Sequence, residues 1–312
     1  MKKMYKIAAC IAVAYSALIM YAYLPVKTAP AIEFAGQDSQ FIQIKGQNIH
    51  FIKKGEGRPL VLIHGFGGST YTWRSLIPAL SLHYAVYALD LPGFGLSDKP
   101  SEGRYTMPGQ ADLVLSFIDA LQIPAPALIG HSMGGIVASY AAIKAPQKIK
   151  DILLIEPGFY HASAPAFLRY LFFPLQRIMA KTFYTKAGRS KSLTASYYNK
   201  SIVTDEVLEA YLQAGRTPNA VDALTGMMRN AAMESYDGVS AQITTPALLV
   251  WSRHNKNNPV QDGERLQKEI KGAQLIIIEG SGHYVQEEKP DALAGAIYKY
   301  LAKEGTRQNI QH

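Results

Sequence analysis

The chain has 312 residues, 48% of them hydrophobic and 18% charged, which is enough to bury a large core in one domain with insertions or in two smaller domains. The formal net charge of +8 raises the question of a nucleic-acid partner, but the basic residues are dispersed, and no finger, helix-turn-helix or RNA-binding motif occurs. We therefore expect a globular protein with a solvated basic surface and no bound nucleic acid.

The N-terminus is basic and then apolar. An uncharged run of 18 residues from Ile7 to Leu24 follows three lysines, Lys2, Lys3 and Lys6. A membrane-spanning helix needs about 20 apolar residues and a secretory signal fewer, so residues 1–26 are predicted to be a signal anchor or signal peptide, with a linker over 27–38. Because basic residues stay on the cytoplasmic side, we predict a protein anchored in the inner membrane with its body in the periplasm or outside. If this segment is cleaved, the body is predicted to be secreted.

Cys10 lies inside the apolar run and is the only cysteine, so the rest of the chain has no disulfide. The absence of disulfides is permitted in an oxidising compartment but does not argue for one. Ile7-Ala8-Ala9 before this cysteine resembles a lipoprotein box, but too few residues precede it to form an apolar signal core, and lipidation is not expected.

Short apolar runs recur along the body of the chain. "QFIQIKG" and "NIHFIKKG" predict a β-hairpin with Gly46-Gln47 at its turn. Six further runs are continuous rather than alternating, as in parallel strands covered on both faces: "PLVLIHG", "YAVYALD", "PALIG", "DILLIE", "PALLVWS" and "AQLIIIEG". Amphipathic segments such as Gln110–Leu121 and Ile136–Lys144 separate most of them. The fold class is therefore predicted to be α/β, a mostly parallel eight-stranded sheet with helices on both faces.

One interval interrupts this alternation. Residues 159–243 contain no clear β run but three segments with helical spacing, "AFLRYLFFPLQRIMAKTFYTK", "TDEVLEAYLQAG" and "AVDALTGMMRNAAM". Thr204 is a plausible helix start, and Pro174 is expected to end or kink the first segment. We predict an inserted helical cap over 159–243 and a core formed by 39–158 and 244–304.

A G-x-S-x-G motif, Gly130-His131-Ser132-Met133-Gly134, directly follows an apolar strand and directly precedes a helix rich in small residues. At such a junction the serine occupies a sharp, strained turn, and side chains at the two glycines would collide with the neighbouring chain. Ser132 Oγ is thereby held out at the carboxyl edge of the sheet, where it is a candidate nucleophile.

Two further loops complete the predicted site. "LVLIHGFGGS" supplies a glycine-rich loop whose backbone N–H groups, with Phe66 and Met133 as donors, suit the oxyanion of a tetrahedral intermediate. A phosphate-binding loop is disfavoured, because the sequence is neither G-x-G-x-x-G nor a P-loop. His283 follows the last apolar strand and comes last in the order serine, acid, histidine.

These motifs resemble the α/β-hydrolase fold family over roughly Arg58 to Leu301, including "LDLPGFGLSDKP" after the fourth strand. The resemblance implies that Ser132 is the nucleophile, that His283 is the general base and acid, and that Phe66 and Met133 are the oxyanion donors. It gives Asp90 and Ser97 the role of stabilising a loop. No metal and no organic cofactor is implied.

The usual triad acid is missing. The family pattern W-G-x-x-D-x-x-x-P corresponds here to "WSRHNKNNP", with Asn255 in place of the aspartate. An asparagine can hold an imidazole but carries no charge, and an Asp-to-Asn change costs a serine protease about 10⁴ in turnover. Some branches of the family carry the acid after the sixth strand, so Glu156 is the predicted replacement, and Asn255 is kept as the alternative triad position. Asp262 and Asp237 are less well placed.

A serine nucleophile with this oxyanion loop favours hydrolysis of a small-molecule ester through an acyl-enzyme. The aromatic stretch "FLRYLFFPL" either lines an acyl pocket or forms the core of the cap; together with the anchor it favours a hydrophobic or lipid ester. The alternatives are a carbon-carbon bond hydrolase or perhydrolase of the same fold, or a non-catalytic binding protein with a degraded triad. The sequence does not indicate the oligomeric state.

Overall fold

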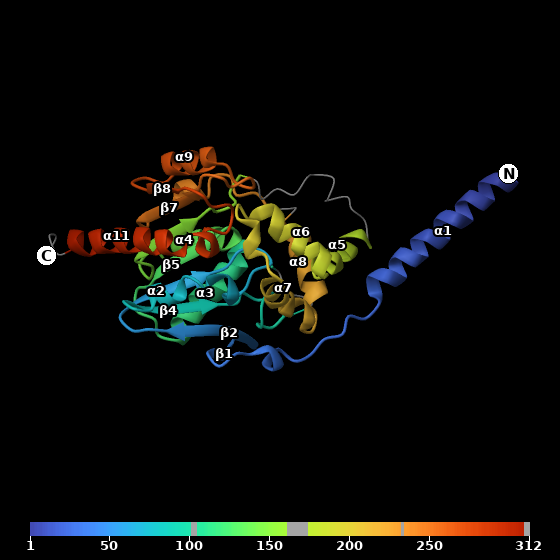
Figure 1. Ribbon diagram of the computed structural model, residues 1–312, viewed down its shortest axis with the longest axis horizontal. Helices are drawn as coiled ribbons and strands as arrows, with labels where there is room; N and C mark the ends of the chain where they lie inside the picture. Colours follow the sequence, from blue (N-terminus) through green and yellow to red (C-terminus); the bar gives the residue numbers. More distant parts are fainter. Residues whose placement is uncertain (101–104, 161–173, 232–233, 309–312) are drawn as a thin grey trace.

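A single eight-stranded sheet runs through the body of the protein (Figure 1). The computed structural model describes residues 1–100, 105–160, 174–231 and 234–308. In sheet order the strands are β1 (Ser39–Ile44), β2 (Gln47–Lys54), β4 (Tyr84–Leu89), β3 (Arg58–Ile63), β5 (Ala127–His131), β6 (Asp151–Ile155), β7 (Ala247–Ser252) and β8 (Gln274–Ile278). β1 and β2 pair antiparallel with their neighbours, and all pairs from β4 to β8 are parallel. The predicted mostly parallel sheet is confirmed.

The first hairpin turns one residue earlier than predicted. β1 ends at Ile44 and β2 begins at Gln47, so the turn residues are Lys45 and Gly46 rather than Gly46 and Gln47. Both turn residues have positive φ angles, 50° and 78°. A two-residue turn with positive φ at both positions matches the right-handed twist of the strands, which explains why it falls there.

Helices cover both faces of the sheet, because the side chains of each buried strand alternate between two cores. In β3, Val61 and Ile63 contribute to one core with α3, α4 and α9, whereas Leu60 and Leu62 contribute to the other with α2 and α11. The helices of the sheet layers are α2 (Ile77–Leu80), α3 (Met107–Ala120), α4 (Met133–Lys144), α9 (Val260–Glu269), α10 (Val285–Glu288) and α11 (Pro290–Gln308).

A helical region is inserted between β6 and β7, at the carboxyl edge of the sheet (Figure 1). Its described helices are α5 (Leu175–Phe183), α6 (Lys186–Ser196), α7 (Asp205–Leu212) and α8 (Ala220–Ala231). Thr204 caps α7 as predicted, since its Oγ1 accepts a hydrogen bond from Val207 N. Pro174 directly precedes α5, and most of the "FLRYLFFPL" stretch lies outside the described residues.

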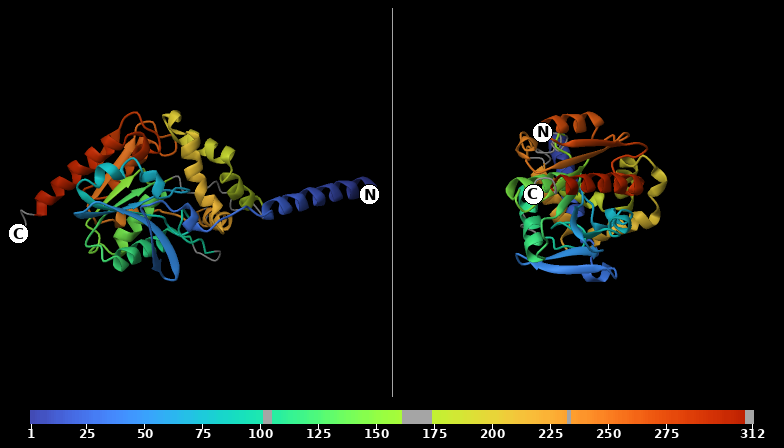
Figure 2. Two further views of the ribbon diagram at one scale, coloured as in Figure 1. Left: turned by 60° about the horizontal axis from the view of Figure 1, so that its bottom comes forward. Right: turned by 90° about the vertical axis from the view of Figure 1, so that its left-hand side faces the viewer.

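The N-terminal helix α1 (Lys2–Tyr23) projects away from the body (Figures 1 and 2). It has the length and composition to cross a membrane, and none of its most apolar 18-residue window is buried. An apolar surface of this size left in water would be strongly unfavourable, so α1 is consistent with a signal sequence or an anchor.

The junction of β5 and α4 is packed too tightly for side chains at its glycines. A Cβ atom on Gly134 would lie 2.1 Å from the carbonyl oxygen of Ile63, and one on Gly130 would lie 2.3 Å from the carbonyl oxygen of Gly134. Both contacts are with backbone atoms, which cannot move aside cheaply. The absence of side chains therefore lets α4 begin directly against β3 and β5.

We expect Gly134→Ala to destabilise the protein by about 3 kcal/mol or more, because the new methyl group forces apart the backbones of β3 and α4. Gly295→Ala in the exposed part of α11 is the matched control: a Cβ there meets nothing within 4 Å, and we expect a gain of about 0.5–1 kcal/mol. Urea unfolding of both variants in detergent measures the difference, and equal stabilities would contradict the close approach at Gly134.

Candidate active site

Ser132 lies in a strained turn between β5 and α4. Its φ and ψ angles are 52° and −116°, a conformation that residues other than glycine rarely adopt. The backbone is held there by a 2.8 Å hydrogen bond from Ser132 N to the carbonyl of Ile155 and by one of 2.9 Å from Gly135 N to the carbonyl of Ser132. Strain of about 1–3 kcal/mol at one residue persists only where the surroundings enforce it, and it is frequent at functional sites.

Two backbone segments flank this turn. Met133 is the first residue of α4, and the first N–H groups of a helix have no partner within it. Phe66 belongs to the glycine-rich loop after β3, in which Gly67 has a φ of +64° and Gly68 N donates to the carbonyl of Gly65 at 3.0 Å. A Cβ on Gly65 would lie 3.1 Å from Ser132 Cβ, so the loop approaches the serine as closely as glycine allows. Both predicted oxyanion residues thus adjoin Ser132.

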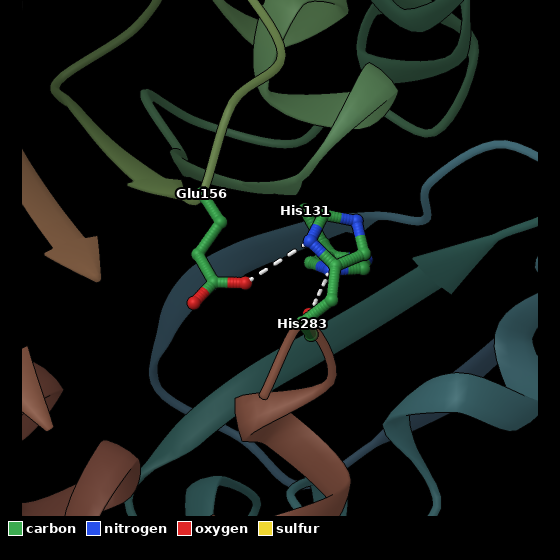
Figure 3. Close-up of side chains that lie close together, drawn as sticks. All are labelled: His131, Glu156 and His283. Carbon is green, nitrogen blue, oxygen red and sulfur yellow. Dashed lines mark hydrogen bonds and ion pairs between the residues drawn. The ribbon is translucent and has the colours of Figure 1, made fainter. Parts of the chain in front are cut away.

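His283, Glu156 and Asn255 meet at the carboxyl edge of the sheet (Figure 3 draws the first two). His283 Nδ1 lies 3.2 Å from Glu156 Oε2 and 3.1 Å from Asn255 Nδ2. Which of the two accepts the proton on Nδ1 depends on how the Asn255 amide is oriented.

The orientation of the Asn255 amide follows from its other contacts. Its Oδ1 accepts hydrogen bonds from the backbone N–H groups of Asn257 at 2.9 Å and Asn258 at 3.2 Å, while Nδ2 donates to Glu156 Oε2 at 2.8 Å. Turning the amide over would place Nδ2 against two donors and Oδ1 against a carboxylate, so the observed orientation is the favourable one. Asn255 therefore directs a donor group, Nδ2, toward His283. The acceptor for a proton on His283 Nδ1 is thus the carboxylate of Glu156.

Glu156 is completely buried, and hydrogen bonds surround it. Its Oε1 accepts from Ser252 N at 2.7 Å, and its carbonyl accepts from Asn258 Nδ2 at 2.7 Å. Its φ angle of 49° is, like that of Ser132, in the left-handed region. A buried carboxylate is tolerated when hydrogen bonds compensate for lost hydration, and the donors around Glu156 supply them.

The backbone of His283 is held from two sides. Its carbonyl accepts a 2.7 Å hydrogen bond from His131 Nε2 (Figure 3). Its N–H donates at 2.8 Å to the carbonyl of Ser196 at the end of α6. Glu156, His131 and His283 offer possible metal-ligand atoms within 4.8 Å of one another, and the Glu156 carboxylate among them already contacts His283 Nδ1. The histidine is thus positioned by the core and by the inserted helical region together.

A buried ionic cluster fastens the inserted region next to His283. The Glu287 carboxylate accepts from Thr72 Oγ1 at 2.7 Å, Tyr197 OH at 2.6 Å, Tyr211 OH and, as an ion pair at 2.5 Å, Arg74 Nη1. Burial and the nearby charge of Glu287 raise the pKa of Tyr211 well above its usual value, so its hydroxyl stays a donor. Core and inserted region are joined here through a carboxylate that is itself fully shielded from water, paired with a partly exposed arginine.

Asp90 and Ser97 stabilise the loop after β4. Asp90 accepts from Thr70 N at 2.6 Å, Leu96 N at 2.7 Å and His50 Nδ1 at 2.8 Å. Burial alone would raise the pKa of Asp90, but the His50 contact outweighs it, with help from Leu96 N, and the net pKa is about 2. Ser97 Oγ donates to the Asp90 carbonyl at 2.6 Å. The contacts match the loop-stabilising role implied by the resemblance.

A cavity of about 290 Å³ opens beside Ser132 and His283. Its other lining residues are Phe66, Met107, Met133, Ile136, Gly158, Met227, Tyr236, Asn257 and Asn258. Methionines from α3, α4 and α8 form much of the apolar wall, and methionine adapts its shape to irregular apolar groups. The inserted region thus contributes directly to the wall of the candidate substrate cavity.

The structure brings Ser132, Phe66, Met133, His283, Glu156 and Asn255 into one site. Asp237 is exposed and bonded to Ser235, and Asp262 lies in the first turn of α9. Sequence reasoning missed Asn258, which bonds the Glu156 backbone, and Ser196, which bonds His283. The asparagine-rich "NKNN" stretch is a signal for the first, but nothing local distinguishes Ser196.

Comparisons with known proteins agree with this arrangement. A family model described as alpha/beta hydrolase fold matches residues 58–290. An uncharacterized hydrolase, YugF, of Bacillus subtilis is 30% identical over 83% of this chain and 96% of its own, and epoxide hydrolase 4 of Mus musculus is 30% identical over 86% and 80%. The crystal structure of a membrane phospholipase A, a bacterial virulence factor, is similar with a TM-score of 0.72 and 25% identity, covering 97% of this chain and 99% of that one.

His131 should make stability depend on pH. Burial, followed by the proximity of His283, lowers the pKa of His131 well below 6.5, so it is neutral in the folded protein but takes up a proton below about pH 6.5 when unfolded. The unfolded state then binds more protons, and stability falls as pH decreases through this range. We expect His131→Gln to reduce this slope by at most about 1.4 kcal/mol per pH unit.

Urea unfolding of the native protein and the His131→Gln variant at pH 7 and pH 5 measures this slope. Each protein serves as its own reference, so a general destabilisation by the substitution does not affect the comparison. Identical losses of stability on acidification in the two proteins would contradict a buried neutral His131.

Proposed function

Since this chain belongs to the alpha/beta hydrolase fold family, we propose that it is a serine hydrolase that cleaves a carboxylic ester through an acyl-enzyme. Ser132 is the proposed nucleophile, His283 the general base and acid, and Glu156 the triad acid. The observation that carries the proposal is the contact of the buried Glu156 carboxylate with His283 Nδ1, beside a serine in the strained turn of a nucleophile.

In the proposed acylation step, His283 Nε2 removes the proton of Ser132 Oγ as that oxygen attacks the ester carbonyl. The C–O bond to the alcohol breaks after a tetrahedral intermediate, and His283 returns the proton to the leaving alcohol. The N–H groups of Phe66 and Met133 are the donors for the negative oxygen of this intermediate. In deacylation, His283 removes a proton from water as the water oxygen attacks the acyl carbon. The bond between the acyl group and Ser132 Oγ then breaks, and His283 returns the proton to Ser132 Oγ as the carboxylic acid leaves.

In the proposed cycle, the negative charge of Glu156 balances the positive charge that His283 acquires when it holds the proton. His283 becomes positive each time it holds the proton, and in a site with little exposure a positive imidazolium needs a negative partner. Asn255 cannot supply that charge, but its Nδ2 holds the carboxylate in place at 2.8 Å. The residue at the usual acid position is thus proposed to position the relocated acid.

The apolar cavity supports an ester with a hydrophobic acyl group. Met107, Met227 and Ile136 line the space beside Ser132, and such a surface gains little from a polar substrate. A lipid ester is favoured because the exposed helix α1 suits a membrane anchor, and because the similar phospholipase structure carries the description of a membrane enzyme. The alignment with this phospholipase structure covers 97% of the 312 residues of this chain, so only about nine residues are unaligned. Because α1 has 22 residues, most of it is included in the alignment.

We further propose that α1 anchors the protein in the inner membrane, with the catalytic body in the periplasm or outside, or that the body is secreted after cleavage. Lys2, Lys3 and Lys6 stay on the cytoplasmic side, so the body follows on the opposite side. At about 1.5 Å per residue, the 22 residues of α1 extend about 33 Å, close to the thickness of the bilayer core.

Other reactions are less well supported. One relative is named an epoxide hydrolase, but such enzymes use a carboxylate nucleophile, and this chain has Ser132. A carbon-carbon bond hydrolase or a perhydrolase would use the same serine, but neither accounts for the anchor. A non-catalytic binding protein would need neither Ser132 and His283 in one cavity nor a buried carboxylate in contact with that histidine.

We expect a fluorophosphonate probe to label Ser132, and hydrolysis of p-nitrophenyl esters to improve from short to medium or long acyl chains. Ser132→Ala should lose labelling and reduce turnover by about 10⁴-fold or more, because no other group can form the acyl-enzyme. Mass spectrometry of the labelled peptide identifies the site. A folded protein that neither reacts with the probe nor hydrolyses any ester would favour the binding protein.

Glu156→Gln and Asn255→Ala should differ in severity. We expect Glu156→Gln to lower turnover by about 10³- to 10⁴-fold, because the imidazolium loses its negative partner. Asn255→Ala removes one donor to that carboxylate and should lower turnover by only about 10-fold. Measuring kcat for both variants on one ester decides the assignment, since a reversed order of severity would make Asn255 the triad residue and exclude the relocated acid.

A further inference from the structure

Two cations of α5 bind the C-terminal end of α1. Lys181 Nζ donates to the carbonyls of Tyr21 and Leu24, both at 2.8 Å, and Arg177 Nε donates to the carbonyl of Ala22 at 3.0 Å. The last carbonyls of a helix lack partners within the helix and carry its partial negative charge, so cations there are stabilising. The anchor helix therefore ends directly against the inserted helical region.

The same two cations also contact aromatic rings of α1. Lys181 Nζ lies 4.7 Å from the ring centre of Tyr21, and the Arg177 guanidinium lies 4.6 Å from that of Tyr23. Tyrosines at the end of a spanning helix prefer the level of the lipid headgroups, and basic side chains near helix ends reach the same level. If α1 spans the membrane, its last turn is at the outer headgroup layer, and α5 is at the same depth.

α5 exposes apolar side chains at this depth. Leu175 and Met179 are 38% and 41% exposed, and their spacing of four residues puts them on one face of the helix. Ala180, on another face, is fully buried against Val221 and Leu224 of α8. An amphipathic helix with an apolar face and basic residues is typical of a segment lying in a membrane interface.

We propose that α5 lies in the headgroup layer of the bilayer and that Leu175 and Met179 contact lipid. The proposal rests on the proposed anchoring by α1 and adds a second membrane contact, made by the inserted region itself. Local charge supports it: Lys181 of α5 and the exposed Arg229 of α8 are cationic, which suits an anionic membrane surface.

The contact would lie next to the candidate active site. Phe183 at the end of α5 packs against Phe66 of the oxyanion loop, with ring centres 5.8 Å apart, and a Cβ on Gly67 would lie 2.5 Å from the Phe183 ring. α5 thus connects the end of the anchor to the glycine-rich loop. A hydrophobic ester leaving the bilayer would meet the protein at this helix.

Depth-dependent quenching of tryptophan fluorescence tests the proposal. The native tryptophans Trp73 and Trp251 are fully buried, so an added surface tryptophan reports its own surroundings. The full chain carrying Met179→Trp is reconstituted in phosphatidylcholine and phosphatidylglycerol vesicles with or without brominated acyl chains. The matched control is Leu82→Trp, at a 75% exposed position two residues after α2, and Figure 1 shows α2 on the side of the body away from α1.

We expect the Met179→Trp emission to shift to shorter wavelength on reconstitution and to fall in brominated vesicles, while the Leu82→Trp emission does not change. Equal emission of Met179→Trp in the two kinds of vesicle would overturn the lipid contact of α5. A second variant, Leu175→Trp, repeats the test one turn earlier and must be quenched as well.

Flotation of the same samples separates this result from the proposed anchor. Protein that floats with the vesicles but shows no quenching at positions 175 and 179 keeps the anchor and excludes the contact. Protein that does not float excludes both. Ester hydrolysis is measured independently in detergent, so neither outcome depends on the proposed reaction. Replacing Arg177 and Lys181 by alanine in the Met179→Trp protein should reduce quenching while flotation is retained, because the helix is then released from α1.

Discussion

The candidate site depends on one buried carboxylate. Glu156 has no exposed surface, and its two oxygens accept from Ser252 N and Asn255 Nδ2 while one of them also contacts His283. An unpaired buried carboxylate would cost several kcal/mol, so strand β7, the loop after it and the histidine loop are mutually constrained around it. The positive φ of Glu156 is a local cost that these contacts offset. An apolar residue at 156 would leave these donors without an acceptor, and a glutamine would supply one uncharged oxygen in place of two carboxylate oxygens.

Hydrogen bonds also join the inserted helical region to the core beside His283. The carbonyl of Ser196 accepts from the N–H of His283. Glu287, four residues after His283, accepts from Tyr197, directly after α6, and from Tyr211 of α7. These hydrogen bonds are shielded from water, where a broken bond leaves an unsatisfied polar group and costs more than its formation contributes. Moving the inserted region as a rigid lid would therefore disturb His283 itself. We therefore expect substrate to enter by movement of side chains such as Met107 and Met227, with α6 and α7 staying in place.

Most of the fold could be predicted from the sequence because strands that are buried on both faces have continuous apolar sequences. Ser132 and His283 could be predicted because each follows such a run, and Glu156 because Asn255 drew attention to a missing charge. The direction of the Asn255 amide could not be predicted, since it is set by the backbone of Asn257 and Asn258. The Glu287 cluster joins residues more than 200 positions apart, from Thr72 to Glu287, and no local pattern records that contact.

Contacts between α5 and the end of α1 constrain how the body of the protein is oriented relative to α1. A flexible linker would let the body rotate freely about its anchor, but Lys181 and Arg177 bond the carbonyls at the end of α1 directly. The orientation of α1 in a bilayer is then transmitted to α5, and from α5 through Phe183 to Phe66. Phe66 is a proposed oxyanion donor beside Ser132, so the proposed anchoring by α1 and the proposed lipid contact of α5 would place one side of the cavity toward the lipid. The contacts of α5 with α1 and with Phe66 would then link membrane attachment to the candidate site.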